Sequence, residues 1–360
     1  MRILFLAWRD LQHPLAGGSE VLVDRLATGL VERGHEVELL CARPAGSRAY
    51  PVTSTGGTYS HYAGVPLSYL RRHRGTDLVV DVANGVPYFS PLWRRGPSLC
   101  LVNHLHTEHW PLWFSPPVAF VGRKVEDRLM PAVYRRTLFV AVSTSTAAAL
   151  AARGVRPDHI RIVHNGVDPD DVPPVKSPTP LFLAMGRLVP NKRFDALLRM
   201  WEAVRPLTGG RLVVLGDGPD SARLRSLAGP DAFLPGWVPE EEKQHLLRSA
   251  WLLLHPSAVE GWGLGIMEAA VRETPAVGFD VPGVRDSVLH GQTGELARSE
   301  EEFARAWARL GTEPSARQAL GRQARQRAAS FSWSSTLDAF AHVVEEALTW
   351  SPTRAPAPCP

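Results

Sequence analysis

Two carboxylates flank a glycine-rich turn in one short stretch, Pro256–Ala270, which reads PSAVEGWGLGIMEAA. Glu260 comes directly before the turn, and Glu268 lies eight residues further on, in the first turns of the helix that we expect next. The turn itself consists of Gly261, Trp262, Gly263 and Leu264. Because a helix begins with unpaired N–H groups and the positive end of its dipole, this turn could bind an anion.

Each glutamate has a plainer explanation beside the functional one. Glutamate is common in first helical turns because it complements the dipole, and for Glu268 this explanation weighs as much as a functional role. Glu260 lies between the apolar strand expected over Trp251–Leu254 and the apolar helix, where an unpaired charge would be costly. We therefore expect Glu260 to have a partner or a ligand.

Two cations follow the apolar segment Leu181–Met185, in the sequence GRLVPNKR. Arg187 and Lys192 precede a helix that we expect from Phe194 onward. Fixed cations near a helix N-terminus suit a diphosphate, which leaves with about two negative charges. Ordinary surface cations are the alternative, and the spacing makes it the weaker one.

Strand, glycine turn and helix follow one another repeatedly along the chain. The first instance is the strand Arg2–Ala7, the pair Gly17 and Gly18, and a helix over Val21–Arg33. This alternation predicts an α/β fold with doubly wound sheets. A glycine pair is more often a plain turn, but its flanking strand and helix favour an anion site. The loop lacks G-x-G-x-x-G spacing, so nicotinamide and flavin cofactors lose their main sequence support.

Three histidines, His104, His106 and His109, follow the strand predicted over Ser98–Val102. Polar side chains just past the carboxyl end of a parallel strand lie where open α/β sheets bind ligands. No carboxylate pattern nearby matches a known zinc motif, so we expect no metal here.

Composition limits the classes of protein that the chain could be. Its 360 residues, 44% of them hydrophobic, suffice for two domains, and a net charge of +4 gives no support for nucleic-acid binding. Cys41, Cys100 and Cys359 form neither a disulfide framework nor a zinc motif, which favours a cytoplasmic location. Met1–Ala7 is read as a strand and not as a signal peptide. No stretch approaches the roughly twenty apolar residues of a membrane helix, so we expect a soluble or peripheral protein.

The pattern PS-x-x-EG-x-G-x-x-x-x-EA resembles the retaining family 4 glycosyltransferases of the GT-B fold. Besides the two glutamates, the residues that carry the resemblance are Pro256, Ser257, Gly261, Gly263 and Ala269. The segments NGVD at 165–168 and GRL…K at 186–192 extend it. The resemblance implies two Rossmann-like doubly wound domains that face each other across a cleft.

The resemblance also implies roles for the candidate residues. Glu260 and His104 would contact the donor sugar at the reaction centre, with His106 as the alternative to His104, and Glu268 would hold the nucleotide ribose. The remaining substrate-binding residues would face the diphosphate, the base or the acceptor: Gly17, Gly18, Arg187, Lys192, Gly236, Val238, Gly261, Trp262, Gly263 and Leu264.

We expect five segments along the chain. They are an acceptor domain (1–168), a Pro-rich linker (169–180), a donor domain (181–332), a helix that returns to the first domain (333–350) and a disordered tail (351–360). Segments 283–288 and 291–294 would complete the second sheet. The family usually has Gly where this chain has Glu273, so the turn there is expected to differ.

The implied function is retaining, metal-independent transfer of a hexose to a hydroxyl acceptor, with no cofactor. The donor would be a UDP-, GDP- or other NDP-sugar, and the acceptor a small molecule, lipid-linked sugar or glycan of the cell envelope, or a natural product. The alternatives are a sugar-nucleotide epimerase, a phosphorylase, and a non-catalytic nucleotide-sugar-binding protein. The full set of Arg187, Lys192, Glu260 and Glu268 favours turnover.

Two further segments allow more than one interpretation. Residues 110–136 mix aromatic and basic side chains, so this region either contacts an anionic membrane surface or acceptor, or packs on its own sheet with a solvated basic face. The second interpretation is the commoner outcome. Asp168 and Asp170 form a D-x-D, which we interpret as solvated linker and not as a metal site.

Overall fold

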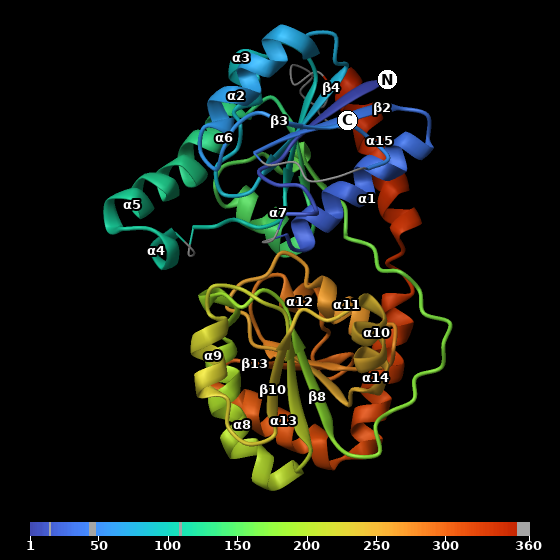
Figure 1. Cartoon of the computed structure of the whole chain (residues 1–360). Coiled ribbons are helices and arrows are strands. Elements are labelled where there is room, and N and C mark those ends of the chain that lie inside the picture. The colour runs from blue at the N-terminus through green and yellow to red at the C-terminus, as the bar shows by residue number, and fades with distance from the viewer. Residues whose placement is uncertain (14–15, 43–47, 108–109, 351–360) are drawn as a thin grey trace, which may run out of the picture. The chain divides into compact units, whose positions relative to one another are not determined.

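The computed structural model describes residues 1–13, 16–42, 48–107 and 110–350 (Figure 1). The chain divides into two compact units. Unit 1 contains Met1–His164 together with the segment from Ser334 onward, and unit 2 contains Asn165–Trp333. The Pro-rich stretch 169–180 therefore belongs to unit 2. Cys359 and the rest of the expected tail lie outside the described residues, as does His109.

Unit 1 is built on a parallel sheet with the order β3-β2-β1-β4-β5-β6-β7 in the described part of the chain. Its strands are β1 (Arg2–Leu6), β2 (Glu36–Cys41), β3 (Val52–Ser54), β4 (Leu78–Ala83), β5 (Ser98–Val102), β6 (Leu138–Ala141) and β7 (Ile160–Ile162). The chain leaves β1 in one direction and returns at β4 on its other side, which makes the sheet doubly wound.

Helices cover both faces of this sheet. They are α1 (Gly18–Glu32), α2 (His61–Ser68), α3 (Ser90–Trp93), α4 (Trp110–Trp113), α5 (Pro116–Lys124), α6 (Met130–Val133), α7 (Thr144–Ala151) and α15 (Trp333–Thr349). Two π-helical turns, η1 (Tyr69–His73) and η2 (Val125–Leu129), continue α2 and α5, and a 3₁₀ turn, η3 (Pro157–His159), precedes β7. The ring centroids of Phe5 on β1 and Phe340 on α15 are 6.3 Å apart, so the last helix packs on the sheet of unit 1.

Unit 2 repeats the plan with a parallel sheet of order β10-β9-β8-β11-β12-β13 among the described residues. Its strands are β8 (Leu181–Met185), β9 (Arg211–Leu215), β10 (Ala232–Gly236), β11 (Leu252–His255), β12 (Ala276–Phe279) and β13 (Gly294–Ala297). Its helices are η4 (Pro190–Lys192), α8 (Phe194–Thr208), α9 (Ser221–Leu227), α10 (Glu240–Ser249), α11 (Leu264–Ala270), α12 (Val284–Ser287), α13 (Glu300–Thr312) and α14 (Pro314–Ala328).

The alternation of side chains along β8 explains why helices lie on both faces of the second sheet. Phe182 and Ala184 belong to an apolar cluster with α8 and α13, whereas Leu181 and Leu183 belong to a cluster with α10 and α11. Successive residues of a strand point to opposite faces, so a strand buried on both sides is a continuous apolar run. This packing fixes the carboxyl ends of β8 and β11, from which the candidate site is built.

One local expectation was wrong. Residues 283–288 contain the short helix α12 and no strand, and the last strand of the sheet, β13, begins at Gly294. Glu273 has a left-handed backbone, with φ of 55°, although it is not glycine. The carboxylate of Glu273 is 3.2 Å from Arg325 NH1 on α14.

Candidate active site

The candidate site of unit 2 lies at the topological switch point of its sheet, where the order of strand addition reverses. The chain runs from β8 outward to β9 and β10, and then returns to β11 on the other side of β8. The loops after β8 and β11 therefore diverge from neighbouring strands, and ligands of open α/β sheets bind in the crevice between such loops. Lys192 comes from the first loop and Glu260 from the second.

Lys192 and Glu260 are in direct contact. The Nζ of Lys192 is 2.5 Å from Glu260 Oε2, and the two side chains are only 16% and 18% exposed. His255, the last residue of β11, has its Nε2 3.1 Å from the same carboxylate oxygen. The backbone N–H of Gly261 donates to Oε1 at 3.3 Å. The structure therefore supplies the partner that the sequence requires for Glu260.

These contacts set the protonation states at this position. Burial by itself raises the pKa of Glu260, but the charge of Lys192, followed by the contact with His255, outweighs it and holds the pKa well below its usual range. Burial lowers the pKa of His255, and Glu260 only partly opposes this. An ionised Glu260 thus accepts hydrogen bonds from a neutral His255, a lysine and the main chain.

Close backbone contacts hold the Glu260 loop in place. The N–H of Ala258 donates to the carbonyl of Asn191 at 3.0 Å, which joins the two loops that carry Glu260 and Lys192. Gly283 has φ of 82°, and a Cβ added to it would lie 2.2 Å from the carbonyl oxygen of Glu260. Only glycine allows this approach without a shift of the loop.

The remaining turn residues lie as the sequence predicts. Gly263 is left-handed, with φ of 81°, and caps α11, which begins at Leu264. Gly261, Trp262 and Gly263 are buried, and the Trp262 and Phe331 rings meet edge to face with centroids 4.9 Å apart. Arg187 is partly buried in the loop after β8.

Glu268 also has a lysine partner, which the sequence alone did not indicate. Lys243 Nζ lies 3.2 Å from Glu268 Oε1 and 2.9 Å from Glu240 Oε1. Lys243 belongs to α10, which follows the loop that contains Gly236 and Val238. Burial raises the pKa of Glu268, and the charge of Lys243 opposes the rise.

In unit 1, His104 and His106 lie in the loop after β5 with their rings stacked, the centroids 4.2 Å apart. The buried carboxylate of Glu126 fixes this loop, because it accepts hydrogen bonds from the N–H of His106 at 2.5 Å and the hydroxyl of Thr107 at 3.0 Å. Both histidines lie just past the carboxyl end of β5, and the Nδ1 of His106 is 3.7 Å from Glu126 Oε1.

The glycine loop of unit 1 is also tied to its own helix. Gly17 has φ of −153° and precedes α1, whose first residue is Gly18. Its N–H donates to Glu20 Oε2 at 2.7 Å, and Glu20 Oε1 lies 3.2 Å from Arg9 Nε. The ion pair between Glu20 and Arg9 is almost fully buried.

One interpretation from the sequence was wrong. Asp170 is not solvated linker, because its carboxylate is buried and bound by two arginines, with Arg248 Nε at 2.9 Å and Arg272 Nε at 2.7 Å from Oδ2. Among the residues that the structure describes, no cluster of three or more His, Cys, Asp or Glu could hold a metal ion. In the same part of the chain, no helix has the length and apolar character needed to cross a membrane.

Residues 110–136 contain both buried and exposed side chains. Only a minority of the side chains on α5 are buried, and Leu112, Phe120 and Val121 are 51%, 61% and 59% exposed. In Figure 1, α5 projects from the sheet of its own unit. The exposed cations Arg123 and Lys124 end this helix.

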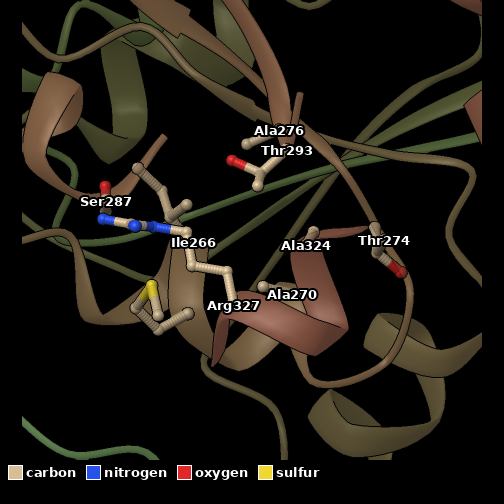
Figure 2. A pocket seen from close by; sticks show the side chains of 9 residues that line it. Ile266, Ala270, Thr274, Ala276, Ser287, Thr293, Ala324 and Arg327 are labelled. Atoms are coloured by element: carbon tan, nitrogen blue, oxygen red, sulfur yellow. The ribbon is translucent and has the colours of Figure 1, made fainter. Parts of the chain in front are cut away.

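A small pocket lies beside α11 (Figure 2). It is lined by Ile266, Met267, Ala270, Thr274, Ala276, Ser287, Thr293, Ala324 and Arg327. The pocket is too narrow for a water molecule, and its walls are mostly apolar. It is a packing gap between α11, α12 and α14, and it contains none of the candidate site residues.

Comparison with known proteins gives the family and the fold class of the chain. The family model of glycosyl transferases group 1 matches residues 170–327, and that of glycosyltransferase family 4 matches residues 16–171. Sucrose-phosphate synthase from Thermosynechococcus elongatus has the same fold, with a TM-score of 0.79, 18% identity, and coverage of 97% of this chain and 100% of that one. Anabaena HepE, crystallised with UDP and glucose, gives a TM-score of 0.78 at 18% identity, over 96% and 100% of the two chains.

Two doubly wound units of this kind define the GT-B class of fold. With the two family models, they show that the chain belongs to the family 4 glycosyltransferases. D-inositol 3-phosphate glycosyltransferase of Rhodococcus erythropolis is 31% identical over 190 residues, which are 48% of this chain and 41% of that protein. The enzyme of the same name from Mycobacterium bovis is 30% identical over 258 residues, 62% and 50% of the two chains. The matches thus span about half the length of these curated relatives.

Proposed function

We propose that this protein transfers a hexosyl group from a nucleotide-diphosphate sugar to a hydroxyl acceptor, with retention of anomeric configuration and without a metal ion. The contact between Lys192 and Glu260 at the switch point of unit 2 carries the proposal, because it puts a cation for a diphosphate beside a carboxylate for sugar hydroxyls. Arg187 and the backbone of 261–264 supply further donors to the leaving diphosphate. UDP-glucose, with which Anabaena HepE was crystallised, is a sugar nucleotide of this class.

In the proposed reaction, the bond between the sugar C1 and the phosphate oxygen breaks as the acceptor oxygen forms its bond to C1. The acceptor hydroxyl gives its proton to the departing phosphate oxygen, on the same face of the sugar. Lys192 and Arg187 stabilise the charge that develops on the diphosphate. Glu260 and His104 orient the sugar while positive charge develops on its ring, and Glu268 binds the ribose. Gly236 and Val238 face the base, and Gly17 and Gly18 face the donor phosphates and the acceptor.

The acceptor belongs to the same proposal. The curated relatives are named for an inositol phosphate, and we propose for this chain a hydroxyl of a small molecule, a lipid-linked sugar or a glycan. The purified protein would be incubated with UDP-glucose, UDP-galactose and GDP-mannose and a panel of such acceptors, with and without EDTA. We expect a new glycoside by mass spectrometry, an unchanged anomeric configuration by NMR, and the same rate in EDTA.

Two other outcomes of this assay would contradict the proposal. Conversion of the sugar nucleotide without a glycoside would indicate an epimerase or a phosphorylase. Binding that persists in Glu260→Gln and Lys192→Ala, with no turnover by any form of the protein, would indicate a non-catalytic binding protein.

A peripheral membrane contact through α4 and α5 is the second part of the proposal. Exposed apolar side chains such as Leu112, Phe120 and Val121 stand beside Arg123 and Lys124, a combination that favours an anionic lipid surface. The test is flotation with vesicles that contain anionic lipid and with neutral vesicles. We expect binding to the anionic vesicles only, and its loss in Phe120→Glu but not in Leu207→Glu, an equally exposed site on α8. Equal behaviour of both variants would refute it.

A further inference from the structure

The charge of the Glu268 carboxylate needs a stabilising partner, because the side chain is partly buried. Its side chain is 29% exposed, and burial raises its pKa, so the carboxylate has lost much of the water that would otherwise stabilise its charge. A carboxylate accepts hydrogen bonds from two ribose hydroxyls only when it is ionised. Something nearby must therefore stabilise the charge.

Three ionisable side chains face Glu268. Lys243 and Glu240 come from α10, and Arg272 follows α11. Glu240 is unfavourable, because its negative charge raises the pKa of Glu268 further. Arg272 is engaged elsewhere, because its Nε lies 2.7 Å from Asp170 and its NH1 donates to the main-chain oxygen of Glu268 at 2.6 Å. Lys243 has the largest opposing effect and contacts the carboxylate itself.

The contact also fixes where the carboxylate lies. Lys243 Nζ is 3.2 Å from Glu268 Oε1, and the lysine is itself only 23% exposed. Burial by itself would lower the pKa of Lys243, but Glu268 and Glu240 outweigh it, so the ammonium stays charged. An ion pair between two partly buried side chains restricts both rotamers more than an exposed pair does. The printed distance joins the lysine to Oε1 of Glu268, so the ion pair fixes that oxygen.

We propose that Lys243 is a positioning residue for the nucleotide, which holds the Glu268 carboxylate ionised and oriented toward the ribose hydroxyls. The inference rests on the proposed function, because it assumes that Glu268 binds the ribose. It adds a second lysine–glutamate pair to the one formed by Lys192 and Glu260, each between a carboxylate near α11 and a lysine from another element. Since α10 follows the loop of Gly236 and Val238, Lys243 also links the ribose end of the site to the segment proposed to face the base.

The test compares a nucleotide with its analogue that lacks ribose hydroxyls. Binding of UDP and 2′,3′-dideoxy-UDP, and of GDP and 2′,3′-dideoxy-GDP, would be measured by calorimetry on the full chain. Hydrogen bonds to a charged group stabilise a complex strongly. The wild type should therefore bind UDP or GDP, whichever it accepts, about tenfold or more tightly than the dideoxy analogue. We expect Lys243→Met to reduce this preference at least threefold, and Lys243→Arg to restore most of it.

A general weakening of the fold would lower both affinities together and leave their ratio unchanged, so the ratio separates positioning from stability. Glu240→Gln is the matched control. It removes the charge of Glu240, which is 69% exposed and also contacts Lys243, but keeps the contact between Lys243 and Glu268. The preference of this variant for the ribonucleotide should equal that of the wild type. In a Glu268→Gln background, Lys243→Met should have no further effect on the ratio.

The outcomes separate this inference from the proposed function. If Glu268→Gln abolishes the preference and Lys243→Met leaves it intact, the inference is wrong and the ribose role of Glu268 stands. If Glu268→Gln itself leaves the preference intact, the ribose contact is wrong and the inference falls with it. A fall in the Glu240→Gln ratio equal to that of Lys243→Met would assign the effect to α10 as a whole and overturn the role of the lysine.

Discussion

Lys192 Nζ and Glu260 Oε2 lie 2.5 Å apart although 68 residues separate them in the sequence. The pair joins the loop after β8 to the loop after β11, at the switch point of the unit 2 sheet. The ion pair restricts the rotamers of both side chains, which are 16% and 18% exposed. In the proposed function, a diphosphate would meet a cation that is already oriented, which would reduce the entropy lost on binding.

Lys192→Met tests whether the Lys192 ammonium stabilises the leaving diphosphate. Since removal of one preorganised donor to a developing charge costs about 10²–10³ in rate, we expect a loss of about 100-fold or more in kcat/KM for the donor. The measurement is initial rate against donor concentration, with kcat separated from KM. Arg199→Met on α8 is the control, because that cation is exposed and pairs with Asp195 on its own helix. If Lys192→Met and Arg199→Met lose activity equally, the loop after β8 does not contact the diphosphate.

Gly283→Ala tests the position of the Glu260 loop. The added Cβ would lie 2.2 Å from the carbonyl oxygen of Glu260, so the backbone of that residue must shift. We expect kcat/KM to fall by about tenfold, since small displacements at a reaction centre are costly. Gly291→Ala is the matched control, because Gly291 also has a left-handed φ, of 72°, but has nothing within 4 Å of the added carbon. A similar fall in both variants would assign the effect to backbone strain alone.

The apolar strands of both sheets could be predicted from the sequence with accurate bounds. The strand expected over Ser98–Val102 is β5, and the apolar segment Leu181–Met185 is β8. Strands buried on both faces are continuous apolar runs, so the local sequence contains the signal. The segment 283–288 has no such run or helical period, and its four-residue helix depends on tertiary packing.

Some residues of the candidate site also have a local signal in the sequence, whereas others depend on tertiary packing. Glu260 and Lys192 could be predicted as neighbouring candidates because glycine turns and charges lie beside apolar strands, which is a local signal. His255 was missed, although a polar residue at the carboxyl end of a central strand is a clue to a site. Lys243 gave no signal in the sequence, because its contact with Glu268 depends on how α10 packs against α11. The burial of Asp170 could not be predicted from its Pro-rich stretch either, because both arginines that bind it are distant in sequence.

Asp170→Ala tests the buried ion pairs at the start of unit 2. Removal of the carboxylate leaves Arg272, whose side chain is 6% exposed, with an uncompensated charge. We expect a loss of about 3 kcal/mol in the free energy of unfolding, measured by urea denaturation. Asp171→Ala, at the exposed next position, should change it by less than about 0.5 kcal/mol. If both variants lose the same amount, the arginines are stabilised by other contacts.

Lys176 makes the stability of unit 2 depend on pH. Its Nζ donates to the carbonyl of Arg272 at 3.0 Å and to Thr274 Oγ1 at 2.6 Å, and burial lowers its pKa from the ordinary 10.5 to about 7. Between these two values the unfolded chain binds a proton that the folded chain does not, so the free energy of unfolding rises with pH. Below about pH 7 the lysine is charged in both states, and this gain is absent.

Lys176→Met removes this dependence. The free energy of unfolding of the wild type minus that of the variant should increase by about 1 kcal/mol or more between pH 7 and pH 9, and change little between pH 5 and pH 6. Urea denaturation at each pH gives the difference, in which the other titrating groups cancel. A difference that stays constant from pH 6 to pH 9 would mean that the ammonium remains charged in the folded chain. In that case its two hydrogen bonds would compensate the loss of water, and the stretch 169–180 would be held by a charged lysine and not by a neutral one.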